Sequence, residues 1–520
     1  MKKSFSRHWL LIGSALAALS FVGITAAQPR PNGHGPDGPR GGADAWRSGS
    51  HGGFGPRYQA GWPARPFHRH QRRPGIDSIR DWNQIAVDAS GLDHTPVAAG
   101  ETRVFGEQFG PCRASRALAI VHLAMFDVVN AVVGGYQGYT PLAPVRGRIC
   151  VNAAVAQAAH DTLCALFPSQ RASFDAELAA DLHTLRNDPG KANGIELGRR
   201  EAALILALRA ADGSQHEEPL VGIEFITGTA PGQWRQDPIS LWPTAIGAYW
   251  GGVKPFVLQS AGQFRIPPPP PLNSLAYAVA FDEVKRLGGD GLITPTERTD
   301  EQTFIGTFWA YDGTPSLCAP PRMYNQLVVL IAGLKHSNDL ELARLLALAN
   351  VAMGDAAIAA WESKFHFQLW RPITGIREAG TDGNALTIQD PTFTPLGAPA
   401  SNLIGPNFSP PFPACPSGHA TFGGAVFQTL RRFYGTDRIA FTFVSDEFNG
   451  ETRDNEGNVR PLVPRSFTSL SQAEEENGQS RIYLGIHWSF DKTEGIAMGR
   501  QVGDYVFQNT LQPLRHPPRR

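Results

Sequence analysis

Four residues, Pro416-Ser417-Gly418-His419, stand directly before the apolar helical pattern ATFGGAVFQTLRRF. The start of a helix leaves backbone N–H groups unpaired and favours negative charge. Ser417 can cap this helix and also donate to an anion, and Gly418 lets an anion approach the backbone. A plain helix cap explains Ser417 but leaves His419, a titratable proton donor, unexplained. The segment therefore predicts an oxyanion site with an acid–base group at its edge.

Two cations occur earlier, in the segment KFHFQLWRP. Lys364 and Arg371 are seven residues apart, about two turns of a continuous helix, so both are expected to point the same way. Pro372 is expected to end that helix, because the residue before a proline is forced out of helical geometry. One interpretation is a solvated cationic face. The aromatic neighbours favour partial burial instead, and buried cations require an anion.

A third segment, SRIYLGIHWSFD, contains Arg481 and His487. These two residues would face different sides of one continuous helix, but Gly485 could break the path and let both converge. Asp491 has two interpretations. It can form a capping box with Glu494 at the start of the helix DKTEGIAMGRQVGDYV, or it can accept a hydrogen bond that orients His487.

Together the three segments supply three fixed cations, a helix N-terminus, a hydroxyl and two histidines. This set is suited to a tetrahedral oxyanion, because Arg makes bidentate contacts to such ions and Lys acts as a point charge. One histidine can attack or ligate the central atom, and the other can move a proton.

The order K-x6-RP, PSGH and SR-x5-H resembles the signature of the superfamily of vanadium-dependent haloperoxidases and type 2 phosphatidic acid phosphatases. The resemblance covers roughly residues 280–510 and extends more loosely to WNQIAVDAS at 82–90. It implies that His487 is the axial ligand of vanadium in bound vanadate and that His419 is the acid–base group. It also implies that the vanadate oxygens are held by Lys364, Arg371, Arg481, Ser417 and the Gly418 N–H.

In the haloperoxidase branch, the resemblance implies hydrogen peroxide and a halide as substrates, with Lys364 polarising the bound peroxide and a hypohalous acid equivalent as the product. Phosphate would compete for the same pocket. The first alternative is therefore a secreted acid phosphatase, in which His487 forms a phospho-histidine and His419 protonates the leaving group. The second alternative is a non-catalytic oxyanion-binding protein.

Flanking residues favour the peroxidase. Trp361 and Phe412 stand where chloroperoxidase-type members carry aromatic residues on the halide side, although ordinary core packing is an equal interpretation. The segment FWAYDG also resembles that branch, which implies that Asp312 pairs with Arg481. His366 is not required by the pattern and is either a core residue or a neighbour of the halide side.

Apolar residues at helical spacing dominate the rest of the chain and predict an all-α fold with two helical bundles in one globular unit. The N-terminal bundle is expected over 76–265 and the C-terminal bundle, which holds the site, over 272–512. A Gly/Pro/Trp-rich connection ending in five prolines at 267–271 separates them. Long loops are expected at 380–415 and 445–480.

The first 75 residues are not expected to belong to the fold. Basic residues, an apolar run and small residues before Gln28 predict a signal peptide over 1–27, and hence a secreted or periplasmic protein. Residues 28–75 are rich in Gly, Pro, Arg and His and predict a disordered leader. That leader is expected to be a spacer, or alternatively to bind an acidic surface, or a metal through His68 and His70.

Composition limits the remaining possibilities. The formal net charge is zero, which gives no reason to expect nucleic-acid binding. No stretch after the signal peptide is expected to span a membrane. Export permits disulfides, so Cys318 and Cys415 could pair, whereas the lack of a CxxC pair makes zinc unexpected. The organic acceptor and the oligomeric state are not predicted.

Overall fold

The computed structural model describes residues 54–62 and 77–514, and it confirms the predicted all-α class. The described residues lie within one compact unit, 43–520. Its helices are α2 (Ser78–Asp93), α3 (Gly110–Val133), α4 (Val151–Leu166), α5 (Arg171–Thr184), α6 (Pro189–Arg209), α7 (Leu275–Leu287), α8 (Asp300–Phe308), α9 (Pro320–Leu334), α10 (Asp339–Phe367), α11 (Pro372–Arg377), α12 (Gly418–Tyr434), α13 (Leu470–Tyr483) and α14 (Ser489–Asn509). Short 3-10 helices are η1 (Pro168–Gln170), η2 (Trp250–Gly252) and η3 (Ala379–Thr381).

Two antiparallel strand pairs accompany the helices. Strand β3 (Phe441–Asn449) pairs with β4 (Leu462–Phe467) in a hairpin that has an irregularity between Val444 and Asn449. This hairpin and the start of α13 occupy the stretch 445–480, so the prediction of a long loop there is wrong. The stretch 380–415 is mostly irregular, as predicted, with the short strand β2 (Leu403–Ile404) inside it.

Part of the predicted leader is also ordered. Residues Gln59–Ala60 form β1, which pairs with β2. Phe54 and Tyr58 are fully buried, and their rings pack against Trp242. For residues 54–62 the prediction of disorder is therefore wrong, because two aromatic side chains bury enough apolar surface to fix a short segment. The predicted signal peptide and the rest of the leader, including His68 and His70, lie outside the described residues.

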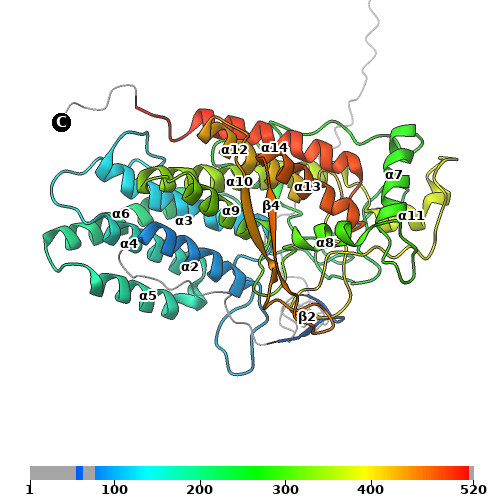
Figure 1. The fold of residues 1–520 in the computed structure, drawn as a ribbon, viewed down its shortest axis with the longest axis horizontal. Helices are drawn as coiled ribbons and strands as arrows, with labels where there is room; N and C mark the ends of the chain where they lie inside the picture. The colour runs from blue at the N-terminus through cyan, green and yellow to red at the C-terminus, as the bar shows by residue number, and fades with distance from the viewer. Residues whose placement is uncertain (1–53, 63–76, 515–520) are drawn as a thin grey trace, which may run out of the picture. The chain divides into compact units, whose positions relative to one another are not determined.

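Helices α3 and α10 form the centre of the core, although one comes from each half of the chain (Figure 1). Both are long and apolar enough to cross a membrane, against the expectation that no such segment exists. Within the unit, 89% of the apolar window of α3 and 100% of that of α10 are buried. Burial on all sides is typical of core helices of a large domain, and this accounts for their composition.

Helices α12 and α14 pack so closely that small residues are required between them. A Cβ atom on Gly499 would lie 2.2 Å from Thr421 O and 2.8 Å from Ala425 N, both on α12. At the start of the same helix pair, Ser417 N–H donates to Asp491 O at 3.0 Å. The close approach therefore places the N-terminus of α12 against the N-terminus of α14, where the candidate residues lie.

We predict that Gly499→Ala lowers the free energy of unfolding by about 1–3 kcal/mol, because an added methyl group must force α12 away from α14. The control is Gly333→Ala on α9, where an added Cβ meets nothing within 4 Å. That change should leave stability unchanged or raise it slightly. Denaturant unfolding of both variants measures the difference, and equal midpoints would contradict the packing argument.

Candidate active site

Lys364 and Arg371 belong to two different elements. Helix α10 ends at Phe367, and Gln368 follows in the left-handed conformation with φ 49°. Arg371 is the N-cap residue of α11, and Pro372 is the first residue of that helix. The prediction that Pro372 ends one continuous helix carrying both cations is therefore wrong. The left-handed residue turns the chain before the proline is reached, and both cations still reach the same pocket.

Lys364 is fully buried and donates to a curved stretch of backbone. Its Nζ lies 2.9 Å from Pro413 O and 3.0 Å from Ala414 O, and it also donates to Pro416 O. These three carbonyls belong to the segment that leads into α12. Lys364 thus holds the PSGH segment in place while bringing positive charge to it.

Arg371 contacts the candidate ligand histidine directly. Its Nε donates to Phe412 O at 2.8 Å and its Nη1 donates to Ile486 O at 2.8 Å. The same Nη1 lies 2.8 Å from His487 Nε2. Since arginine can only donate, this contact requires an unprotonated Nε2 with its lone pair facing Arg371.

The start of α12 matches the prediction. Ser417 is the N-cap residue, and its hydroxyl accepts from Ala420 N at 3.4 Å. A Cβ on Gly418 would lie 3.1 Å from the Trp361 ring, so a larger residue would crowd the aromatic wall. His419 lies in the first turn of α12, and its Nε2 lies 2.5 Å from Ala310 O. A carbonyl can only accept, so Nε2 is the protonated nitrogen and Nδ1 is left to exchange a proton.

Gly485 brings Arg481 and His487 together, as predicted. It separates α13 from α14 with a φ of 71°, which favours glycine. A Cβ there would also lie 2.4 Å from Gly288 O. Both Arg481 and His487 line the same small cavity as a result.

Asp491 both orients His487 and helps to cap α14, but it caps as the N3 residue and not as an N-cap paired with Glu494. Helix α14 begins at Ser489, three residues earlier than a capping box of Asp491 and Glu494 requires. The Asp491 carboxylate accepts from His487 Nδ1 at 2.9 Å and from Trp488 N at 3.0 Å. The proton of His487 is thereby fixed on Nδ1, which agrees with the lone pair that Arg371 requires at Nε2.

Asp312 pairs with Arg481, as the resemblance implied. Asp312 Oδ1 accepts from Arg481 Nη2 at 2.6 Å, and both side chains are almost fully buried. Asp312 follows Ala310, whose carbonyl contacts His419, by two residues. The loop 309–313 therefore positions one cation and the candidate acid–base group together, a role for Ala310 O that no side-chain pattern could have predicted.

Burial and mutual repulsion shift the titration of these groups. Burial, and then Arg371, holds the pKa of Lys364 well below its ordinary value. Burial lowers the pKa of Arg371 to about 9 and raises the pKa of Asp491 to about 6. Burial together with Arg481 lowers the pKa of His419, and burial together with Arg371 lowers that of His487. Both histidines are therefore neutral in the anion-free pocket at neutral pH.

The unpaired donors of the pocket indicate what it binds. Arg371 Nη2 and Arg481 Nε and Nη1 are buried and have no hydrogen-bond partner within residues 54–62 and 77–514. Unpaired buried donors on charged groups are costly. An oxyanion would satisfy all three donors and offset the repulsion between the cations. The residues present therefore fit a tetrahedral oxyanion such as vanadate or phosphate.

Trp361 and Phe412 form an aromatic wall beside the cations. Their ring centroids are 4.9 Å apart, and Lys364 Nζ lies 5.5 Å from the Trp361 ring and 5.1 Å from the Phe412 ring. Both line a cavity of about 40 Å³ together with His419 and His487. Part of the wall comes from the N-terminal half, through Phe109, Trp242 and Ile246. Sequence reasoning placed the site wholly in the C-terminal bundle and missed these residues, which carry no motif.

Two other predictions about single residues, for His366 and for the cysteines, are not supported by the structure. His366 is exposed and belongs neither to the core nor to the aromatic wall. All five cysteines are free thiols in the described part of the chain, so Cys318 and Cys415 do not pair.

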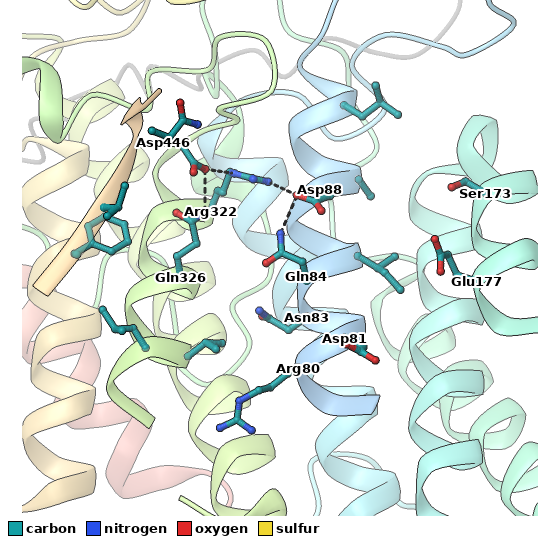
Figure 2. Close-up of a pocket in the computed structure, with 18 of the residues that line it drawn as sticks. Arg80, Asp81, Asn83, Gln84, Asp88, Ser173, Glu177, Arg322, Gln326 and Asp446 are labelled. Carbon is teal, nitrogen blue, oxygen red and sulfur yellow. Dashed lines mark hydrogen bonds and ion pairs between the residues drawn. The ribbon is translucent and has the colours of Figure 1, made fainter. Parts of the chain in front are cut away.

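A larger cavity of about 850 Å³ lies between α2, α5, α9 and β3 and contains none of the predicted site residues. Figure 2 shows that its central Arg322 is already paired with Asp88 and Asp446.

Comparison with known proteins agrees with this geometry. Residues 344–516 match the profile of the VCPO second helical-bundle domain. The chain is 32% identical over 531 residues to vanadium chloroperoxidase of Curvularia inaequalis, with 84% of each chain covered.

Two solved structures have a similar fold. A bacterial vanadium-dependent iodoperoxidase matches with a TM-score of 0.67 and 22% identity, covering 86% of this chain and 100% of that one. The holo form of a bacterial vanadium-dependent chloroperoxidase matches with a TM-score of 0.57 and 17% identity, covering 79% and 94%. The sequence identity over most of both chains is the stronger finding, and by it the chain belongs to the vanadium-dependent haloperoxidase family.

Proposed function

We propose that this protein is a vanadate-dependent haloperoxidase, which uses hydrogen peroxide to oxidise a halide to a hypohalous acid equivalent. The observation that carries the proposal is the set of unpaired buried donors on Arg371 and Arg481 close to His487, whose Nε2 carries no proton. Membership of the family, whose relatives are named chloroperoxidase and iodoperoxidase, supports it.

The chain's own residues would hold vanadate from several sides. Arg371 and Arg481 would donate through their unpaired N–H groups, and Ser417 and the Gly418 N–H would donate from the start of α12. His487 would bind through Nε2 once Arg371 Nη1, which lies 2.8 Å from Nε2 in the anion-free pocket, turns to the anion, with Asp491 holding the ring. When bound, vanadate supplies a Lewis-acidic centre that activates hydrogen peroxide without a change of oxidation state.

Two further residues would act on the bound reactants. Lys364 would stabilise developing negative charge, since its ammonium group is buried beside the PSGH backbone. His419 would take up and return protons at Nδ1, because its Nε2 is committed to Ala310 O. Trp361 and Phe412 would exclude water and leave a halide weakly solvated.

Export is a separate part of the proposal. The basic residues, apolar run and small residues that precede Gln28 support a cleaved signal peptide and a secreted or periplasmic enzyme. Cell fractionation of the native producer, with N-terminal sequencing of the protein found, would test it, and a cytoplasmic protein that retains Met1 would overturn it.

The function is tested on phosphate-free protein incubated with orthovanadate and then with hydrogen peroxide and chloride, bromide or iodide. We predict halogenation of a chlorinatable diketone that depends on vanadate and is lost in His487→Ala, since that change removes the ligand nitrogen. The control is His366→Ala, an exposed histidine that lies between Lys364 and Arg371 in the sequence, and it should retain activity.

A parallel sample without vanadate receives p-nitrophenyl phosphate. Phosphate hydrolysis without halogenation would favour the phosphatase alternative. Vanadate binding without either activity would favour the non-catalytic alternative. Comparison of the three halides identifies the substrate, which the names of the relatives leave open.

We predict that Asp491→Asn lowers halogenating activity or vanadate affinity by about 10- to 100-fold, because the neutral amide holds the His487 ring less strongly. The matched control is Asp504→Asn on the same helix, where the carboxylate pairs with Arg432. Vanadate titration and steady-state rates measure both variants. Equal losses in the two would show that Asp491 acts only on stability.

The pH profile tests the role of His419. Its pKa is lowered in the anion-free pocket by burial and by three cations, and a bound anion raises it again. The protonated form is lost as pH increases, so we predict that the rate falls from the acidic to the neutral range. His419→Gln should remove this pH dependence as well as lower the rate. A wild-type profile that is flat from about pH 4 to 9 would contradict the assignment.

A further inference from the structure

A second cluster of metal-binding side chains lies between α4 and α5, outside the active site. His160 and Cys164 are four residues apart on α4 and therefore share one face, and Asp175 comes from α5. Their potential ligand atoms all lie within 4.8 Å of one another. His160 Nε2 is 2.8 Å from Asp175 Oδ1 and 3.5 Å from Cys164 Sγ.

The ring of His160 is already held in the orientation that a metal ligand needs. Its other nitrogen, Nδ1, lies 2.7 Å from Asp161 Oδ1, and Asp161 accepts in turn from Gln157 Nε2 at 2.8 Å. Metal-binding histidines characteristically donate their second nitrogen to a carboxylate in this way. Trp82 packs edge-on against the imidazole, with an interplanar angle of 86°. Nε2 is thereby directed at Cys164 and Asp175.

Burial divides the cluster into an inner and an outer side. His160 is 6% exposed and Cys164 is 3% exposed, whereas the Asp175 side chain is 55% exposed. An ion can therefore enter from the side of Asp175, and water can complete its coordination there. Nitrogen, sulfur and oxygen ligands together suit a borderline divalent ion, and Zn²⁺ accepts all three in a tetrahedral arrangement.

We propose that His160 Nε2, Cys164 Sγ and Asp175 bind one divalent transition-metal ion, best matched by Zn²⁺, which links α4 to α5. On binding, the Cys164 thiol releases its proton to solvent, His160 binds through unprotonated Nε2, and no electron is transferred. The expectation against zinc relied on the lack of a CxxC pair. The relevant sequence signal is instead the H-x3-C spacing on a helix. None of these residues lines the active-site cavity, so the proposal does not depend on the haloperoxidase function.

The competing explanation is a purely ionic cluster, in which a protonated His160 bridges Asp161 and Asp175 and no metal binds. Titration with Co²⁺ distinguishes a metal site from an ionic cluster, because a thiolate bound to Co²⁺ gives a charge-transfer absorption that an ionic cluster lacks. The full chain, reduced with a phosphine in phosphate-free buffer, is titrated with Co²⁺ and then with Zn²⁺. We expect one equivalent of Co²⁺ to bind with that absorption, and Zn²⁺ to displace it and raise the unfolding temperature.

Variants locate the site. Cys164→Ser should abolish the absorption, and Asp175→Asn, at an exposed position that folding tolerates, should weaken Co²⁺ binding by at least about tenfold. The control is Cys150→Ser, which removes the cysteine that precedes α4 and should leave binding unchanged. No thiolate absorption in the wild type, or the same absorption in Cys164→Ser, would overturn the proposal.

Discussion

The structure depends on the burial of positive charge in one pocket. Lys364, Arg371 and Arg481 are each no more than 1% exposed, and only Arg481 is paired with a carboxylate, that of Asp312, among the described residues. Charges out of water are costly unless they are paired, and here hydrogen bonds to backbone carbonyls compensate only in part. The remaining cost is offset when an oxyanion enters. The fold therefore favours anion binding, and burial together with the same charges lowers the pKa of both histidines.

Rigid helix packing prevents this pocket from relaxing. A free guanidinium would turn toward water, but Arg371 is tied to Phe412 O and Ile486 O, and Lys364 is tied to the backbone before α12. Close contact of α12 with α14 through Gly499 fixes the two helix starts against each other. As a result the cations and both histidines lie close together before an anion enters, and binding at His487 Nε2 would displace only its contact with Arg371 Nη1. Such near-complete preorganisation favours electrostatic catalysis.

Residue types and spacing predicted the cations, Ser417, both histidines and Asp491, because each has a chemical reason to occur there. Asp312 was expected only from the family resemblance, and the Ala310 carbonyl was not predicted. The sequence did not predict the features of the site that depend on backbone conformation. The left-handed turn at Gln368 places Lys364 and Arg371 on different elements, and glutamine is not a residue type that indicates such a turn. Because α14 starts early, Asp491 is its N3 residue and not its N-cap, and its carboxylate accepts from both Trp488 N and His487 Nδ1. Phe109 and Trp242 could not be predicted as wall residues, because they reach the cavity through packing between distant segments.

We propose that the apolar wall favours halide oxidation over phosphate hydrolysis in this pocket. Both reactions can use the same cations and the same two histidines, but hydrolysis needs water at the bound anion, whereas an oxidised halide must be protected from side reactions. A cavity of about 40 Å³, lined by Trp361, Phe412 and Trp242, has room for a few water-sized molecules but not for a bulky phosphate ester. Trp242 comes from the N-terminal half, which packs on the C-terminal half through α3 and α10, so that half shapes the cavity as well as the core.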